Sequence, residues 1–391
     1  MTKKRKTTSS KRSRKKQAKF TPGAILLLLL IVGILFLGSW FKWFQVDWEA
    51  VLEGDFEHAI LKPPVVVEPV SGEWYQLYFT SPQYPDDERT RVYTLIDGLV
   101  AAINNAQRTI DIAIYEFDLD QIADALIAAR NRGVQVRLVT DSDELDQLDT
   151  LIRLKKERFP IVPDERGAIM HNKFAVIDGA AVWTGSWNFT PNDTFRNNNN
   201  AILIQSPELA KNYTTEFEEM FLRHEFGPTS PANTPYPKIQ LGDTLIETCF
   251  APEDDCSDRL VELVQGAQHS ITFMAFSFTD VAIGQAVSER GRAGVAVRGI
   301  FETRGSETEF SEFAQMKRQN LDVRQDGNPY TLHHKVFIID NQVVTLGSFN
   351  FSDNANRAND ENMLIIHNPD IAAEFLAEFD RNYTLAQNAI Q

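Results

Sequence analysis

In the first part of the chain, hydrophobic residues recur with strand spacing in two segments and with helical spacing in the segment between them. Residues 106–115 read as the end of a helix followed by a strand, and residues 134–139 alternate apolar and polar side chains as a strand does. Between them, residues 119–132 have apolar side chains at helical spacing, and Gly133 ends that pattern. The apolar positions of this helix are Ile122, Ala125, Leu126 and Ala129. The pattern predicts the order strand, helix, strand.

The same order returns later in the chain. Residues 267–271 lead into a strand, a helical pattern ends near Gly294, and residues 295–300 alternate as the next strand. An internal repeat of this kind indicates two structural units of one type. Because strands alternate with helices in both units, we predict an α/β sandwich in each half.

A different hydrophobic pattern marks the N-terminus. Residues 23–41 contain no charged side chain and as a helix would rise about 28 Å, close to the hydrocarbon thickness of a bilayer. Ten of the 39 Lys and Arg residues lie within 1–20, and Trp40 and Trp43 stand at the far end, as in a helix oriented by the positive-inside rule. We expect one transmembrane anchor over 23–43, with the N-terminus cytoplasmic and the body outside. The alternative, a cleaved signal peptide, is disfavoured because no Ala-x-Ala-like site follows.

Proline-rich breaks divide the remaining chain into segments. The expected organisation is a basic cytoplasmic tail over 1–22, the anchor, a stalk over 44–72, a first half over 73–226, a Pro-rich linker over 227–243 and a second half over 244–391.

The repeat is sharpest in two polar motifs. The first copy reads His171-Asn172-Lys173, four apolar residues and Asp178, followed by Gly185-Ser186-Trp187-Asn188. The second copy reads His333-His334-Lys335, four apolar residues and Asp340, followed by Gly347-Ser348-Phe349-Asn350. Each residue of the second copy stands 162 positions after its counterpart. A constant offset across two motifs is not expected by chance.

The spacing within one copy predicts a local arrangement of side chains. On a strand, His171 and Lys173 share a face. Asp178-Gly179 is a turn signal, so the returning strand would bring Ser186 and Asn188 back beside them. Two such halves, related by a pseudo-two-fold axis, would face their polar groups across one cleft.

Such a cleft suits a phosphodiester. Lysines and carboxamides donate hydrogen bonds to phosphate oxygens and stabilise the charge on a five-coordinate phosphorus. One histidine can attack phosphorus and form a phosphohistidine, while the other protonates the leaving oxygen. This scheme needs no metal ion or cofactor, and the sequence shows no metal-ligand cluster of Cys or His.

These motifs resemble those of the phospholipase D superfamily, His-x-Lys-x4-Asp followed by Gly-Ser-x-Asn. The resemblance runs in two copies from about residue 75 to the C-terminus. It implies a catalytic set of His171, Lys173, Asp178, His333, Lys335 and Asp340, supported by Ser186, Asn188, Ser348 and Asn350. Within that set, it implies a mostly structural role for the two aspartates.

One departure from the family pattern concerns an acid that often follows the second motif and orients the histidine. The second half has Glu361, whereas the first has Asn199 at the equivalent position. We therefore expect two non-equivalent histidines. Glu116, which follows a strand of the first half, is our candidate to replace the missing acid beside His171. Family precedent favours His171 as nucleophile and a lone Glu361 would favour the other histidine, so the choice stays open.

Three further residues bear on the fold. Cys249 and Cys256, the only cysteines, lie seven positions apart around a turn-rich segment, and in an exported domain they could form a disulfide. His334 should point away from its catalytic neighbour and have a structural role.

Charge bears on the substrate. The formal net charge is −15, and all 54 Asp and Glu residues lie after the basic tail. An acidic body repels nucleic acid at long range, and no basic, aromatic-rich stripe is visible. We therefore favour a membrane phospholipid as substrate over DNA or RNA. An endonuclease, a cardiolipin synthase-like transferase and a non-enzymatic scaffold are the alternatives, and no obligate protein partner is evident.

Overall fold

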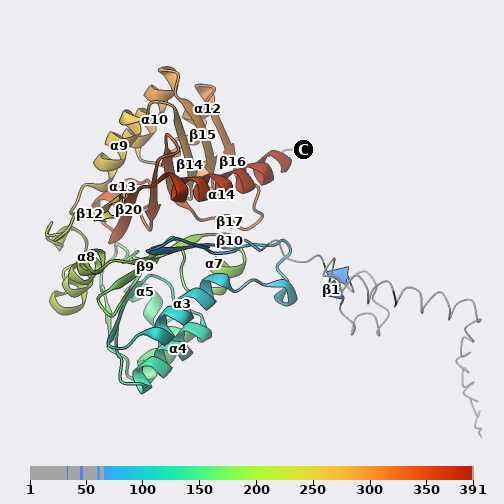
Figure 1. Cartoon of the computed structure of the whole chain (residues 1–391). Coiled ribbons are helices and arrows are strands. Elements are labelled where there is room, and N and C mark those ends of the chain that lie inside the picture. The colour runs from blue at the N-terminus through green and yellow to red at the C-terminus, as the bar shows by residue number, and fades with distance from the viewer. Residues whose placement is uncertain (1–32, 34–44, 47–59, 62–65, 390–391) are drawn as a thin grey trace, which may run out of the picture. The chain divides into compact units, whose positions relative to one another are not determined.

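The computed structural model describes Gly33, residues 45–46, 60–61 and 66–389 (Figure 1). The described residues fall into two units, divided between residues 63 and 64. In the first unit, strands β1 (Gln45–Val46) and β2 (Ile60–Leu61) pair antiparallel. Among the helices of the described ranges, none combines the length and apolar character needed to cross a bilayer. The anchor predicted over 23–43 lies outside the described residues except at Gly33, and it stays a prediction.

The second unit contains two eight-stranded mixed sheets of the same design. The first has the order β3-β4-β11-β9-β8-β5-β6-β7 and the second the order β12-β13-β20-β19-β18-β14-β15-β16. The strands of the first are β3 (Val70–Ser71), β4 (Tyr75–Phe79), β5 (Thr109–Ile114), β6 (Gln135–Thr140), β7 (Ile161–Pro163), β8 (Lys173–Ile177), β9 (Ala181–Gly185) and β11 (Asn200–Gln205). Those of the second are β12 (Lys238–Leu241), β13 (Thr244–Ala251), β14 (Ser270–Ala275), β15 (Ala296–Phe301), β16 (Asp322–Gln325), β18 (Lys335–Ile339), β19 (Val343–Gly347) and β20 (Glu361–His367).

Helices lie on both faces of these sheets. The first half contains α3 (Thr94–Asn105), α4 (Asp120–Asn131), α5 (Ser142–Leu145), α6 (Asp149–Lys156), α7 (Pro191–Phe195), α8 (Pro207–Glu218), a π-helix η2 (Glu219–Arg223) and the 3-10 turns η1 (Glu88–Thr90) and η3 (Gly227–Thr229). The second half contains α9 (Cys256–Gly266), α10 (Val281–Arg292), α11 (Thr303–Ser306), α12 (Phe313–Arg318), α13 (Asp353–Arg357) and α14 (Pro369–Asn388).

Three hydrophobic cores define the layers. The outer cores join the first sheet to α3, α4 and α6, and the second sheet to α9 and α10. The central core draws side chains from the inner faces of both sheets and from α8 and α14, so the two halves share one interior. Because both faces of each sheet are covered, β8 and β18 are buried along their whole length, which explains their continuous apolar runs.

The predicted local structure is found in both halves. The helix expected over 119–132 is α4, and it ends before Gly133, whose φ of +95° suits a residue without a Cβ. The turn between β8 and β9 uses Asp178 and Gly179, both with positive φ, as in the hairpin turns that match strand twist. The disulfide between Cys249 and Cys256 is present and joins β13 to the start of α9.

The boundaries between segments differ slightly from the expected ones. Strand β3 lies in the predicted stalk, and β12 lies in the predicted linker over 227–243, because both add an edge strand to their sheets.

Candidate active site

The two motif histidines lie where the halves meet. His171 lies two residues before the start of β8. Its backbone N–H donates to the carbonyl of Asp360, 3.0 Å away in the other half. His333 is placed in the same way by a 3.0 Å bond to the carbonyl of Asn198. Short parallel pairing reinforces this, since β10 (Asn197–Asn198) pairs with β17 (Thr331–Leu332). Each histidine is thus held by the backbone of the opposite half.

The side-chain partners of the histidines also come from the opposite half. His171 Nδ1 lies 2.8 Å from Glu361 Oε2, and His333 Nδ1 lies 2.9 Å from Asn199 Oδ1. The expectation of non-equivalent histidines is correct, but the acid of the second half serves the histidine of the first.

The hypothesis that Glu116 supplies the acid beside His171 is therefore wrong, because Glu361 makes that hydrogen bond. Glu116 is half-buried and lines a pocket of about 460 Å³ with Asp118 and Asp193. Burial and the charge of Asp193 raise the pKa of Glu116 to about 7, while the charge of Lys173 acts to lower it. Glu116 thus belongs to the electrostatic surroundings of the site.

Asn199 is oriented by its own neighbours. Its Oδ1 accepts a 2.8 Å hydrogen bond from Ser186 Oγ, and its Nδ2 donates to the carbonyl of Asp193 at 3.0 Å. Because Oδ1 is the acceptor, the Nδ1 of His333 must carry the hydrogen in this pair. The Nε2 atom of His333 is then the one left for proton transfer.

The serines of the second motif support this arrangement. Ser186 Oγ contacts Asn199 and accepts from the N–H of Asn200, and Ser348 Oγ accepts from the N–H of Asn362. Both serines are fully buried. Their hydroxyls therefore fix the strands that carry the histidine partners, and so act as supporting groups.

The two lysines are buried beside the histidines. Lys173 and Lys335 are 1% and 2% exposed, and each Nζ donates at 2.8 Å to the carbonyl of the histidine two residues earlier. The ammonium of Lys173 lies over the ring of Tyr115, and that of Lys335 over the ring of Phe276. These contacts use only part of the donor capacity of an ammonium group.

The motif asparagines complete the set. Asn188 is 3% exposed, its backbone N–H donates to Asp193 Oδ2, and its Oδ1 has no hydrogen-bond partner among the described residues. The Oδ1 of the equivalent Asn350 is likewise buried without such a partner. A buried polar atom without a partner is costly, and at an active site it indicates a place prepared for a ligand or water.

The pKa values of the two histidines and the two lysines are each influenced by charged groups of both halves. Burial lowers the pKa of His171 to about 4, although Glu361 acts to raise it, and Lys335 of the other half acts to lower it. Burial and then the charges of Lys335 and Lys173 hold the pKa of His333 well below its ordinary value. Burial lowers the pKa of Lys173 to about 8 and holds that of Lys335 well below its ordinary value. The four groups interact across the two halves, as one site requires.

The motif aspartates lie away from this set. Asp178 follows the last residue of β8, and its carboxylate accepts hydrogen bonds from the backbone N–H groups of Gln107, Arg108 and Thr109. Asp340 makes the same three bonds in the second half. Burial acts to raise the pKa of both, but the backbone donors outweigh it and lower the pKa. These backbone contacts agree with the mostly structural role that the resemblance implies for the two aspartates, and we expect neither to take part in the chemistry.

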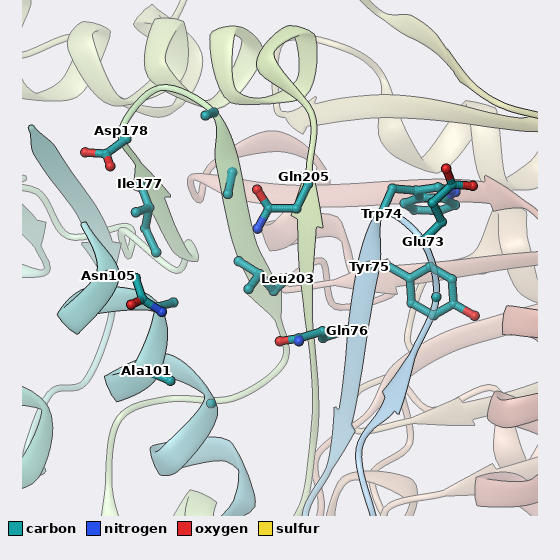
Figure 2. A pocket seen from close by; sticks show the side chains of 15 residues that line it. Glu73, Trp74, Tyr75, Gln76, Ala101, Asn105, Ile177, Asp178, Leu203 and Gln205 are labelled. Atoms are coloured by element: carbon teal, nitrogen blue, oxygen red, sulfur yellow. The ribbon is translucent and has the colours of Figure 1, made fainter. Parts of the chain in front are cut away.

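Figure 2 shows the surroundings of Asp178. It lines a pocket of about 430 Å³ with Asn105 of α3, Gln205 of β11 and Trp74 beside β4. This pocket lies at the opposite end of β8 from His171 and contains none of the histidines or lysines. We assign it no part in the chemistry.

Sequence reasoning missed Asp193. Its Oδ2 lies 3.6 Å from His333 Nδ1, it receives the N–H of Asn188, and its Oδ1 receives the amide of Asn197. At the equivalent position of the second half stands Ala355, so the repeat gave no signal here.

Comparison with known proteins identifies the family. Residues 99–221 and 260–383, more than half of the chain, match the family model described as cardiolipin synthase, PLD-like domain. A phospholipase D of Rickettsia bellii is 31% identical over 151 residues, which are 37% of this chain and 75% of that protein. A mitochondrial cardiolipin hydrolase of Xenopus tropicalis is 32% identical over 133 residues, 34% of this chain and 62% of that protein.

A solved structure shows the same fold over a longer range. The phosphatidylserine synthase of Haemophilus influenzae superposes with a TM-score of 0.59 at 13% identity, covering 79% of this chain and 85% of that one. With the doubled motif and both halves matched by one family model, the chain belongs to the phospholipase D superfamily.

Proposed function

We propose that this chain is a phosphodiesterase that hydrolyses the headgroup ester of phospholipids through a phosphohistidine intermediate. The observation that carries the proposal is the reciprocal pairing of His171 with Glu361 and of His333 with Asn199. It joins two imidazoles with different partners and two buried ammonium groups in one site. Such a set can bind an anion, attack it and protonate the departing group.

His171 is the proposed nucleophile. Glu361 accepts the hydrogen of its Nδ1, so the lone pair is on Nε2, and the lowered pKa keeps this imidazole neutral. When Nε2 attacks phosphorus, the ring gains positive charge that the carboxylate stabilises. The lysines and the amides of Asn188 and Asn350 are the proposed donors to the phosphate oxygens.

His333 is the proposed acid and base. The negative charge of a bound phosphodiester favours the protonated form of His333, whose pKa burial otherwise lowers. In the first step the Nε2–H of this imidazolium gives its proton to the headgroup oxygen as the P–O bond breaks and the N–P bond forms. In the second step Nε2 takes a proton from water, the hydroxide oxygen attacks phosphorus, and the N–P bond breaks. The products are the free headgroup alcohol and a phosphatidic acid, and the nucleophile returns to its starting state. These groups supply every charge and proton of the scheme, so it requires no metal ion.

The choice of a lipid rests on several supports. The chain is acidic overall, which disfavours polyanionic nucleic acid, and the proposed anchor would hold the body beside a bilayer. The names of the Rickettsia and Xenopus relatives point to phospholipid substrates as well. The proposed setting is a single-pass membrane protein whose catalytic body lies on the extracytoplasmic side.

The test offers purified full-length protein in detergent both phosphatidylcholine and plasmid DNA, at 25 °C, in parallel samples with and without EDTA. Headgroup release without nicking is expected, and His171→Ala measured in parallel controls for contaminating activities. Nicking without headgroup release would overturn the lipid proposal in favour of an endonuclease. A new phospholipid in place of phosphatidic acid would indicate a transferase, and no reaction with either substrate would oppose an enzymatic role.

A further inference from the structure

A buried group of three carboxylates lies outside the residues that the proposed reaction uses. Glu216 is near the end of α8, Glu219 begins the π-helix η2, and Glu253 follows β13 of the second half. One carboxylate oxygen of each lies within 4.8 Å of one oxygen of both others. Glu216 and Glu219 are only 3% and 1% exposed. Three anions so close together in a buried place repel one another strongly unless a cation or protons balance them.

The oxygens of this group are poorly satisfied. The amide of Asn233 lies near enough to Glu219 to act to lower its pKa, but neither carboxylate oxygen of Glu219 accepts a hydrogen bond of good geometry, and Oε2 of Glu253 is also buried without one. The guanidinium of Arg223 lies 3.2 Å from Glu219 Oε1, but this side chain reaches in from the surface and is 42% exposed. A single screened cation does not balance three carboxylates, and it leaves Oε2 of Glu219 unpaired. A nearly fully buried carboxylate oxygen with no donor can be satisfied by a bound water or cation.

In the second half, basic side chains balance the charge of the equivalent acid. Glu378 stands 162 positions after Glu216, at the equivalent point of α14. It receives a hydrogen bond from His334 Nε2 at 3.1 Å and lies 2.7 Å from the guanidinium of Arg381. In the first half the equivalents of His334 and Arg381 are Asn172 and Glu219. Where the second half has two basic groups, the first half therefore has a neutral amide and another acid.

We propose that Glu216, Glu219 and Glu253 form a Ca²⁺ site that takes the place of those basic side chains. The donors are all carboxylate oxygens, which suit a hard cation and not the nitrogen- and sulfur-seeking metals. Ca²⁺ accepts several protein carboxylates in a flexible geometry, whereas Mg²⁺ usually keeps several waters and is held by only one or two carboxylates. Protein ligands would leave coordination positions for water.

The position of this site gives it a structural consequence. Two ligands belong to the first half and Glu253 to the second, so the ion ties the end of α8 to the loop after β13. Asn172, between the catalytic His171 and Lys173, lies 3.5 Å from Glu216 and also receives the amide of Asn362 at 2.8 Å. Calcium would thus stabilise the contact between the halves beside the active site.

The test measures binding and stability, and it is independent of the proposed reaction. Full-length protein is stripped with EDTA, exchanged into chelator-free buffer and titrated calorimetrically with CaCl₂, with MgCl₂ in parallel. One Ca²⁺ per chain is expected, with weaker binding of Mg²⁺. At about 100 times the dissociation constant, the midpoint of thermal unfolding should rise by several degrees.

Two charge-matched variants separate this site from surface binding. Glu253→Gln removes one ligand at a half-buried position and should abolish both the binding isotherm and the calcium-dependent rise in Tm. Glu218→Gln removes an acid beside the cluster and should leave both intact. Saturable binding that survives Glu253→Gln would overturn the proposal. So would wild-type protein that neither binds Ca²⁺ nor gains stability from it, since shared protons would then balance the carboxylates.

Discussion

The two halves share a scaffold but differ in the groups that surround their histidines. Both place a lysine at the start of a buried strand and an aspartate in the turn at its far end. The histidine of the first half faces a carboxylate, whereas that of the second faces a carboxamide with Asp193 3.6 Å away. Since each partner is supplied by the opposite half, a change in one half alters the chemistry of the other. The repeated backbone therefore holds two histidines in different chemical surroundings.

The largest expected effect separates the roles of the histidines. His171→Ala and His333→Ala should each lower headgroup release by at least about 10³-fold, because each removes a group needed in both steps. On bis(p-nitrophenyl) phosphate, whose leaving group departs without protonation, the first step of His333→Ala should regain at least about tenfold of the lost rate and that of His171→Ala none. Pre-steady-state bursts of p-nitrophenol provide the comparison, because the second step still needs His333 as base. The reverse pattern would make His333 the nucleophile, and near-wild-type activity of either variant would refute a shared site.

Removing the acid of the pair should have the next largest effect. Glu361→Gln keeps the size of the side chain but loses the charge that raises the pKa of His171 and stabilises its imidazolium. We expect kcat to fall about 10²- to 10⁴-fold with the fold intact. Glu378→Gln is the matched control, because it removes another buried acid hydrogen-bonded to a histidine and should change Tm more than kcat. Equal losses of kcat in the two variants would contradict a specific role for Glu361.

Making the halves alike should produce a smaller and directional effect. Asn199→Asp places an anion 2.9 Å from His333 Nδ1, which should raise the pKa of that histidine from its depressed value. As the proposed acid, His333 would then stay protonated to higher pH, and the alkaline limb of the kcat/KM profile should move upward by about one unit or more. Asn192→Asp, an exposed change of equal charge nearby, should leave the profile in place. A downward shift would contradict the acid role.

The smallest effect on catalysis is expected at the motif aspartates. Asp178→Asn weakens three hydrogen bonds to backbone N–H groups and should cost about 1–3 kcal/mol of stability. The reaction rate should change less than about twofold, because this carboxylate lies at the far end of β8. Chemical denaturation and the standard assay measure the two quantities, and Asp340→Asn should behave alike. A hundredfold loss of kcat in folded protein would return these residues to the catalytic set.

Much of the local structure was predictable because it depends on near neighbours. The helix before Gly133 and the hairpin at Asp178 follow from apolar spacing and from residues that tolerate positive φ. The disulfide could be anticipated because its cysteines flank a single turn. By contrast, β12 fell within an expected linker, because an edge strand is defined by the neighbour it pairs with.

The sequence by itself determined the doubled motif, the α/β repeat, the family and the inequality of the two histidines, since all of these are encoded in residue types and spacing. Only the tertiary structure decided which acid serves which histidine. A repeat suggests that each half completes its own site, but the loops before β8 and β18 pair with the opposite half and carry their histidines across. That exchange depends on packing in the shared core between residues far apart in the sequence. Local sequence patterns carry no information about such contacts.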